Sequence, residues 1–351
     1  MPSSRRPSSG DDDRQSRSSR AERAARAARA ARAAGSERSQ RAQPADRANR
    51  PARASRAPRS QSGPARPGRQ RPRRSARGEP DAAGIGIPGS DLWARVLVAV
   101  PAAVIAIVFV NFGGLAFALF MIAAGVVCMH ELYRMLARWR TAPVVGFVAL
   151  ATMAIAARYG SERDVLEIAV AALPVTFLVV IARGHPGAST VAIAGTLLGI
   201  YWIGFAFAHA VLLRGVTNGK GIIIDILVGT FLGDTGAYFG GRMFGRRPLA
   251  PAISPHKTVE GLFCGMLVTM VSVFVAGTFQ PWLSQGDALL LGLTVAVLGP
   301  LGDLFESVVK RDSGAKDAGN LFGAHGGALD RLDAVIFTIV GGYYVWLAVM
   351  H

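Results

Sequence analysis

The sequence predicts an all-α polytopic integral membrane protein of about nine transmembrane helices, with a cytoplasmic N-terminus and a disordered N-terminal tail. Three observations carry this prediction. Of the 351 residues, 51% are hydrophobic and only 18% are charged. From Trp93 onward, apolar runs approach the roughly 20 residues that cross a bilayer. Finally, the strong positive charge is confined to the first 90 residues, which contain almost no large apolar side chains.

The tail holds 22 Arg, no Lys and 8 acidic residues, a net charge of +14, whereas the other 261 residues carry 17 basic and 15 acidic groups, or +2. A segment so poor in apolar side chains cannot offset its ordering entropy, which predicts disorder. Three interpretations stay open: contact with anionic lipid headgroups, nonspecific nucleic-acid binding, and a solvated tail that mainly fixes topology. The tail lacks the apolar core of a signal peptide, so we expect no cleaved one.

Nine apolar stretches follow the tail, and several of them are marginal in length for a span. They cover residues 93–111, 114–133, 142–158, 165–182, 189–213, 221–239, 260–279, 286–306 and 333–350. We divide the chain accordingly into the tail (1–90), an N-terminal transmembrane region (91–220) and a C-terminal catalytic region (221–351).

The charges of the loops predict the topology. The loops after the second, fourth, sixth and eighth stretches carry twelve Lys and Arg, and the opposite loops carry four. The positive-inside rule then places the N-terminus and both long polar loops on the cytoplasmic face. Arg outnumbers Lys 35 to four, which suggests a GC-rich genome, and we expect a multi-pass protein of a bacterial plasma (inner) membrane.

Three of the four lysines lie in the two long polar loops: Lys257, Lys310 and Lys316. Where Arg is the default cation, a retained Lys hints that a compact ammonium group is needed, for instance against a phosphate.

The eighth stretch ends with Asp303, Ser307, Lys310 and Arg311, which share one helical face. Cations at the negative end of a helix dipole explain Lys310 and Arg311 without any function. They do not explain Asp303, and an ionisable residue at the membrane boundary is a candidate for a functional site.

The segment "GAHGGALDRLD" follows. The pair Gly326-Gly327 suits a turn that cradles phosphate oxygens. Asp330 and Asp333 share a face of the next helix, although Asp333 alone could be an ordinary dipole partner. Asp303 and Asp330 offer the hard carboxylate oxygens that Mg²⁺ takes. His325 could be a ligand, a proton carrier or a phosphate donor, and the residues alone do not choose.

The loop after the sixth stretch offers a second set of polar groups. Asp234 ends an apolar run, and Ser254, Lys257, Thr258 and Glu260 stand just before the next helix. Hydroxyl, ammonium and backbone N–H groups there form a plausible anion site. Alternatively, Ser254 or Thr258 only caps the helix, with Glu260 in its first turn.

These features predict a metal-assisted phosphate site on the cytoplasmic face. That arrangement fits a lipid phosphotransferase or a nucleotidyltransferase better than a transporter, whose site is expected at the bilayer midplane.

The segment from Ser307 to Asp333 resembles the signature of the phosphatidate cytidylyltransferase (CDP-diacylglycerol synthase) family. "GDTGAY" and "SPHKTVEG" resemble two further stretches of that family, and the resemblance covers residues 225–337. The matching signature positions are Ser307, Lys310, Arg311, Lys316, Asp317, His325, Gly326, Gly327, Asp330, Arg331 and Asp333.

The resemblance implies that CTP and phosphatidic acid react to give CDP-diacylglycerol and pyrophosphate. It implies Mg²⁺ held by Asp303 and Asp330, with a second, monovalent cation and a homodimer left open. The catalytic group would comprise Ser307, Lys310, Arg311, Lys316, Asp317, His325 and Asp333. Substrate binding would involve Asp234, Ser254, Lys257, Thr258, Glu260, Gly326, Gly327 and Arg331.

Three alternatives remain. A CDP-alcohol phosphotransferase would carry a DGxxAR-type motif, which this chain lacks. A polyprenol kinase also pairs membrane spans with metal-bound carboxylates. A transporter would leave the polar loops merely solvated.

Overall fold

The computed structural model describes residue 101 and residues 103–184, 187–319 and 326–349. The predicted disordered tail, the beginning of the first apolar stretch and His325 therefore lie outside the described residues. Within the described ranges the chain is almost entirely helical, which confirms the prediction of an all-α polytopic membrane protein.

The described residues contain seven helices that are long and apolar enough to cross a membrane, and two shorter apolar helices, Ala103–Phe112 and α4. The central span is continuous from Ser189 to Gly215, because a π-helical turn, η2, joins α6 to α7. In chain order the elements are α3 (Gly114–Met135), η1 (Ala137–Trp139), α4 (Pro143–Tyr159), α5 (Glu162–Ala182), α6 (Ser189–Leu198), η2 (Gly199–Gly204), α7 (Phe205–Gly215), α8 (Gly219–Phe244), β1 (Pro248–Ala250), β2 (Ser254–Thr258), α9 (Val259–Thr278), α10 (Gln285–Ser313) and α11 (Leu329–Val349).

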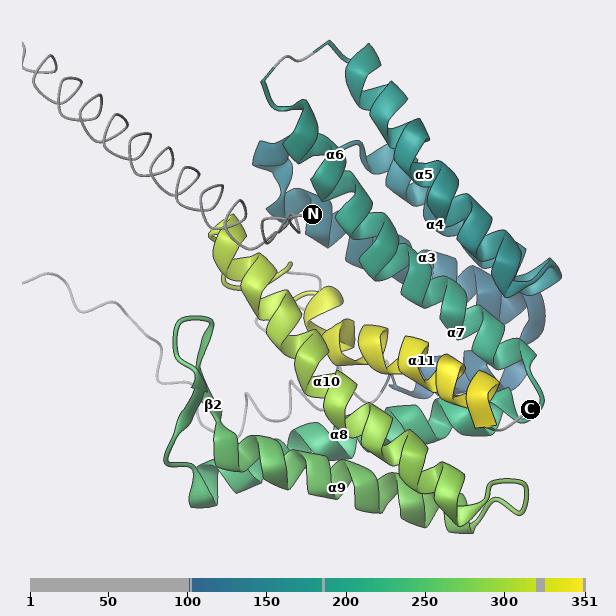
Figure 1. Ribbon diagram of the computed structural model, residues 1–351, viewed down its shortest axis with the longest axis vertical. Helices are drawn as coiled ribbons and strands as arrows, with labels where there is room; N and C mark the ends of the chain where they lie inside the picture. The colour runs from purple at the N-terminus through teal and green to yellow at the C-terminus, as the bar shows by residue number, and fades with distance from the viewer. Residues whose placement is uncertain (1–100, 102, 185–186, 320–325, 350–351) are drawn as a thin grey trace, which may run out of the picture. The chain divides into compact units, whose positions relative to one another are not determined.

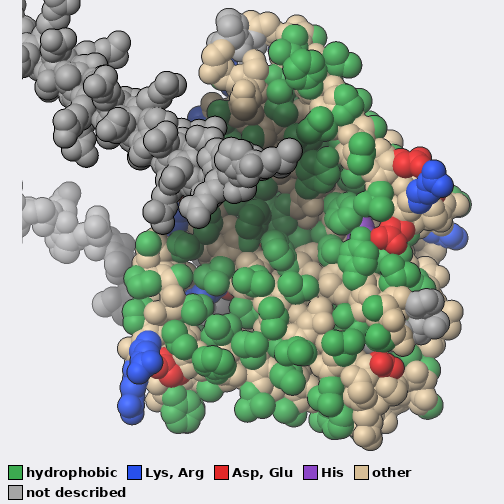
Figure 2. All heavy atoms as spheres, viewed as in Figure 1, with side chains coloured by type: hydrophobic (Ala, Val, Ile, Leu, Met, Phe, Trp, Pro, Cys, Tyr) green, Lys and Arg blue, Asp and Glu red, His purple; other side chains and the backbone are tan. Residues whose placement is uncertain are grey.

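The burial of each span shows which helices form the centre of the bundle. In the most apolar 18-residue window of the Ser189–Gly215 span 61% is buried, whereas the corresponding windows of α5 and α9 are only 28% and 22% buried. One face of the molecule is largely covered by hydrophobic side chains, with charged groups mainly near its margins (Figure 2). Such apolar exposure is expected of helices that face lipid rather than water.

The C-terminal helices bring the two ends of the family-like signature together. α9 packs along α8, and α10 contacts both of them as well as α11 (Figure 1). At Gly302 of α10, a side-chain Cβ would collide with the backbone carbonyl of Asp333 in α11. The glycine therefore lets the two helices approach closely, as small residues do in membrane bundles.

A two-stranded hairpin, which the sequence analysis treated only as a polar loop, connects α8 to α9. β1 pairs with β2 antiparallel, with Pro248 opposite Thr258 and Ala250 opposite Ser254. Prolines at positions 248, 251 and 255 disfavour a helix there, because proline lacks the N–H group that a helix interior uses.

Candidate active site

Three carboxylates from two helices meet where α10 ends and α11 begins. Asp303 and Glu306 come from α10 and Asp333 comes from α11, and one oxygen of each lies within 4.8 Å of the others. Positions 303 and 306 share a helical face because they are three residues apart. Glu306 is fully buried and Asp333 is 9% exposed, and Glu306 Oε1 has no hydrogen-bond partner. Clustered hard oxygens of this kind can hold a divalent metal ion.

Lys310 links this acidic cluster to the signature. Its Nζ donates to Glu306 Oε2 at 2.6 Å and to Asp330 Oδ1 at 2.8 Å. The lysine side chain is 16% exposed, and the two carboxylate side chains are 1% and 12% exposed. Because water screens these charges little, the ammonium group balances two carboxylates that would otherwise repel each other.

Asp330 also orders the chain that precedes it. Its Oδ2 accepts from the backbone N–H groups of Gly327 at 2.7 Å and Ala318 at 2.9 Å. Gly326 has a φ of +81°, a conformation that glycine adopts at low cost. In this structure both oxygens of Asp330 thus have protein partners, and its predicted role as a metal ligand stays a prediction.

The hairpin contributes a second lysine. Lys257 of β2 forms an ion pair with Asp303. Asp234 of α8 lies close enough to Asp303 and Lys257 for their charges to interact. The Nε of Arg311 donates to the backbone oxygen of Ile253 at 3.1 Å. Lys257 and Arg311 together attach the hairpin to α10.

The hydroxyl and acidic residues next to α9 have structural partners. Thr258 is the N-cap of α9, where its Oγ1 accepts from the Gly261 N–H at 3.1 Å. Glu260 Oε2 accepts from the backbone N–H groups of Arg246 and Arg247 at 3.0 and 3.1 Å. The capping alternative is therefore correct for Thr258, and the substrate-binding role of Thr258 and Glu260 stays a prediction.

The remaining candidate residues differ in burial. Ser307 is buried on α10, whereas Lys316, Asp317 and Arg331 are exposed, and Ser254 is partly buried in β2. Lys316 and Asp317 belong to the segment that follows α10. Their roles, like that of His325, stay predictions.

Two functional candidates were missed by sequence reasoning. Glu306 lies three residues after Asp303 and four before Lys310, so the helical spacing already placed it on the same face. The other is Glu131 of α3, which is distant in sequence from the signature and carried no motif.

Glu131 supports the signature from the N-terminal half of the chain. It is 5% exposed, and its Oε2 accepts from the Leu329 N–H at 2.9 Å. A Cβ at Gly319 or at Gly327 would collide with the Glu131 carboxylate. Glycine at both positions thus makes room for the buried carboxylate, which fixes the beginning of α11.

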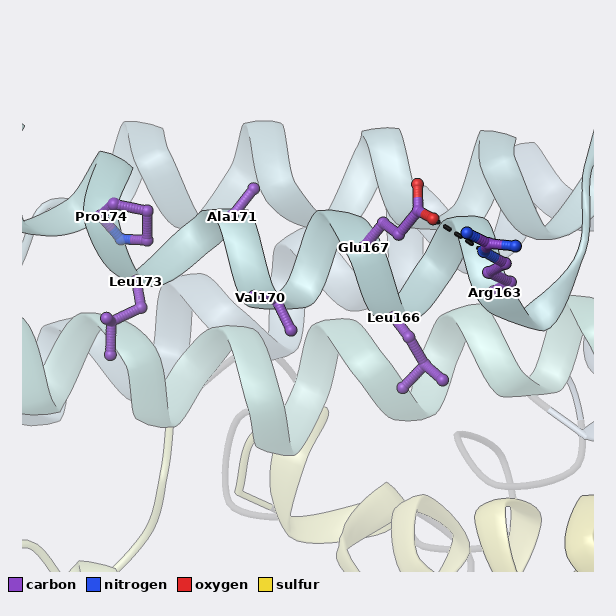
Figure 3. A pocket seen from close by; sticks show the side chains of 7 residues that line it. All are labelled: Arg163, Leu166, Glu167, Val170, Ala171, Leu173 and Pro174. Carbon is purple, nitrogen blue, oxygen red and sulfur yellow. Dashed lines mark hydrogen bonds and ion pairs between the residues drawn. The ribbon is translucent and has the colours of Figure 1, made fainter.

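A groove in the described part of the chain lies away from this cluster. It has a volume of about 580 Å³ and runs along the outer face of α5 (Figure 3). Its lining is apolar except for the ion pair of Arg163 and Glu167 at 2.9 Å. An open apolar stripe on a lipid-facing helix has no groups for phosphate chemistry, so the carboxylate cluster is the better candidate.

Comparison with known proteins agrees with the signature and extends it. The sequence profile of the cytidylyltransferase family matches residues 93–349. This chain belongs to the cytidylyltransferase family. The matched range includes Glu131 as well as the carboxylate cluster, so the family model covers the N-terminal helices and not only the C-terminal signature.

Individual relatives of this cytidylyltransferase are bacterial proteins. The phosphatidate cytidylyltransferase of Bacillus subtilis is 34% identical over 268 residues, which cover 73% of this chain and 97% of that protein. The phosphatidate cytidylyltransferase of Mycobacterium bovis is 28% identical over 305 residues, or 79% of this chain and 94% of that protein. Uncharacterized protein YnbB of Escherichia coli is 37% identical over 158 residues, or 42% of this chain and 53% of that protein.

Proposed function

We propose that this protein transfers a cytidylyl group from CTP to phosphatidic acid, giving CDP-diacylglycerol and pyrophosphate for phospholipid biosynthesis. The observation that carries the proposal is the cluster of Asp303, Glu306 and Asp333 beside Lys257 and Lys310, built from a family signature at the end of membrane-spanning helices. Family membership and the names of the relatives support the same reaction.

The carboxylate cluster fits a divalent metal ion, which we propose to be Mg²⁺. Glu306 Oε1 is buried without a hydrogen-bond partner, and two further carboxylates lie next to it. A bound cation would neutralise this excess of negative charge, and Mg²⁺ commonly takes one or two carboxylates together with substrate phosphates. When bound, the ion would supply charge neutralisation at the reacting phosphates.

The protein's own residues would position two polyanions at the membrane boundary. A phosphatidate oxygen would attack the α-phosphorus of CTP while the bond to the pyrophosphate oxygen breaks. Lys310 forms ion pairs with Glu306 and Asp330. The ion pair of Lys257 with Asp303 attaches the hairpin to α10. Either ammonium group could instead contact a phosphate oxygen, which favours the developing negative charge of the transition state.

The predicted topology places this site on the cytoplasmic face, where CTP is available, and we propose the bacterial inner membrane as its location. Contact of the N-terminal tail with anionic headgroups, a homodimer and a monovalent cation beside Mg²⁺ stay predictions. The division of the chain at residue 220 also stays a prediction, although the hydrogen bond from the Leu329 N–H to Glu131 links the two regions.

Membranes that contain the full chain test the proposed function directly. They are given phosphatidic acid, Mg²⁺ and CTP labelled either at the α- or at the γ-phosphate. We expect the α-label to enter a CDP-lipid and the γ-label to leave as pyrophosphate. Label that reaches the lipid only from the γ-position would indicate a kinase. Absence of labelled lipid from membranes with folded protein would refute the proposal.

A further inference from the structure

The end of α8 and the first residues after it combine exposed apolar and basic side chains. Four large side chains there are between 55% and 71% exposed: Tyr238, Phe239, Met243 and Phe244. Three exposed arginines lie among and directly after them: Arg242, Arg246 and Arg247. We call these seven residues the α8 surface. Figure 2 shows Lys and Arg side chains beside hydrophobic ones at the margin where the hairpin joins α9 in Figure 1.

The α8 surface lies at the end of a membrane span. α8 is long and apolar enough to cross a membrane, and it ends at Phe244. Water is an unfavourable neighbour for a patch of large apolar side chains, and hydrocarbon is an unfavourable neighbour for guanidinium groups. The boundary between the two, where the phosphates of lipids lie, suits both kinds of side chain.

The arginines of the α8 surface have few partners in the protein. Within the described ranges, no ion pair joins any of them to a carboxylate. Arg242 donates to the hydroxyl of Tyr238 at 3.5 Å, which is a long and neutral contact. Glu260 is close enough to Arg247 for their charges to interact. One carboxylate beside three guanidinium groups leaves an excess of positive charge, and guanidinium groups bind phosphate oxygens well.

The backbone that carries two of the arginines is held in place. Glu260 Oε2 accepts from the backbone N–H groups of Arg246 and Arg247 at 3.0 and 3.1 Å. The backbone oxygen of Arg247 accepts from the Val259 N–H at 2.9 Å. A fixed backbone lowers the ordering cost of binding a ligand. The positive-inside rule explains arginines at this end of the bundle, but it does not require such a fixed arrangement.

The α8 surface is connected to the catalytic cluster along one face of α8. Asp234, Tyr238 and Arg242 are spaced four residues apart and therefore share that face. Asp234 lies close enough to Asp303 and Lys257 for their charges to interact. Arg242 follows Asp234 by eight residues, or about 12 Å along a helix. A phosphate held by Arg242 would therefore lie within a short lateral movement of the carboxylates.

We propose that the α8 surface docks phosphatidic acid from the cytoplasmic leaflet, with the arginines on its phosphate and the apolar side chains along its acyl chains. This inference rests on the proposed function, because it gives the lipid substrate a place to bind before it reaches the carboxylate cluster. A phosphomonoester carries up to about two negative charges near pH 7, which matches the excess of positive charge. CTP has no acyl chain for the exposed aromatic side chains to contact, which favours the lipid.

The first test measures the kinetics of the full-length protein in mixed micelles of detergent and phosphatidic acid. The mole fraction of phosphatidic acid is varied at saturating CTP, and CDP-lipid formation is measured. Arg242→Gln should raise the KM for phosphatidic acid by about fivefold, the effect of one basic residue near an anionic surface. Adding Arg246→Gln and Arg247→Gln should raise it further. The kcat and the KM for CTP should not change.

The second test measures docking without turnover, by thermal unfolding in detergent without CTP. A ligand that binds the folded state raises the unfolding temperature. We expect a larger rise with phosphatidic acid than with phosphatidylcholine or glycerol 3-phosphate. The rise should shrink in Arg242→Gln and persist in large part in Arg242→Lys, which keeps the charge. The matched control is Arg158→Gln, which removes an exposed arginine from the last turn of α4 and should keep the full rise.

A smaller rise in Arg242→Gln than in Arg242→Lys and Arg158→Gln would support the proposal. Equal rises in all variants, an equal response to glycerol 3-phosphate, or an increase in the KM for CTP instead of the lipid would overturn it. The two assays also separate this inference from the proposed function. Absence of CDP-lipid from wild-type protein would refute the reaction, whereas the unfolding assay would still report whether the lipid docks at the α8 surface.

Discussion

The two ends of the bundle bury carboxylates in different ways. At the site end, Lys310 joins Glu306 and Asp330, Lys257 joins Asp303, and backbone N–H groups bind Asp330 and Glu131. At the opposite end, Asp225 has a single amide as its partner, and Glu162 accepts from Tyr344 at 2.8 Å and Tyr343 at 3.3 Å.

The partners of the carboxylates at each end indicate which kinds of ligand that end could bind. The site end combines an excess of carboxylates with the ammonium groups of Lys257 and Lys310, so internal ion pairs there can be exchanged for a metal ion and for phosphates. At the opposite end, Asp225 and Glu162 have neutral partners, an amide and two phenol groups, instead of ammonium groups. Among the described residues, the site end thus offers the combination of carboxylates and ammonium groups that the proposed binding of a metal ion and a nucleotide requires.

The largest effect is expected from the carboxylate cluster. Asp303→Asn, Glu306→Gln and Asp333→Asn should each lower kcat by about a hundredfold or more, the usual cost of removing one electrostatic element of an active site. Because the proposed role is metal binding, a higher Mg²⁺ concentration should restore part of the activity. The measurement is CDP-lipid formation across a Mg²⁺ titration.

Asp287→Asn is the control for these substitutions, because its carboxylate lies at the opposite end of the bundle in the first turn of α10. It should leave kcat unchanged. Full activity in Glu306→Gln at low Mg²⁺ would contradict the assignment of the cluster.

The next effect concerns stability. Lys310→Met leaves two largely buried carboxylates without their counter-charge, which should destabilise the fold by about 3–5 kcal/mol, as for other broken buried pairs. The double substitution Lys310→Met with Glu306→Gln removes one of the two charges as well and should recover part of this loss. Unfolding in detergent measures both changes.

The matched control is Lys220→Met, because Lys220 is exposed at the other end of the bundle. Its effect on stability should be small. If the double substitution were no more stable than Lys310→Met, the charges would not be coupled as the distances indicate.

A smaller effect is expected at Glu131, which touches the signature but not the carboxylate cluster. Glu131→Ala removes the acceptor of the Leu329 N–H and leaves a space beside Gly327, so kcat should fall by about 10- to 100-fold, as for other supporting residues. Glu131→Gln retains an oxygen acceptor and should recover most of kcat. Equal losses in the two variants would show that charge, rather than the hydrogen bond, is what matters.

Much of this architecture could be predicted from the sequence, because span length, loop charge and helical spacing are local properties. The face of α10 that carries Asp303 and Lys310 follows from residue spacing alone. Partnerships across the fold could not be predicted in this way. Glu131 meets Leu329 only after α3 packs beside α11, and the second oxygen of Asp330 is occupied only once the segment before α11 folds.

The contacts of the hairpin likewise could not be predicted from the sequence. The sequence predicted only a polar loop there, and nothing local indicated that Lys257 would pair with Asp303 or that Arg311 would donate to Ile253. Such contacts depend on the relative positions of α8, α9 and α10, which neither hydropathy nor a motif specifies.

The smallest predicted effect compares two helix caps, one at each end of the bundle. Thr258 caps α9 beside the site, and Ser284 caps α10 at the opposite end, each through an oxygen that accepts from a backbone N–H at 3.1 Å. Thr258→Ala and Ser284→Ala should each cost about 1 kcal/mol of stability. Only Thr258→Ala should also raise the KM for CTP, by a few fold, because Thr258 adjoins Lys257. A similar rise in Ser284→Ala would attribute the change to stability rather than to position, and the hairpin would then have no specific role in nucleotide binding.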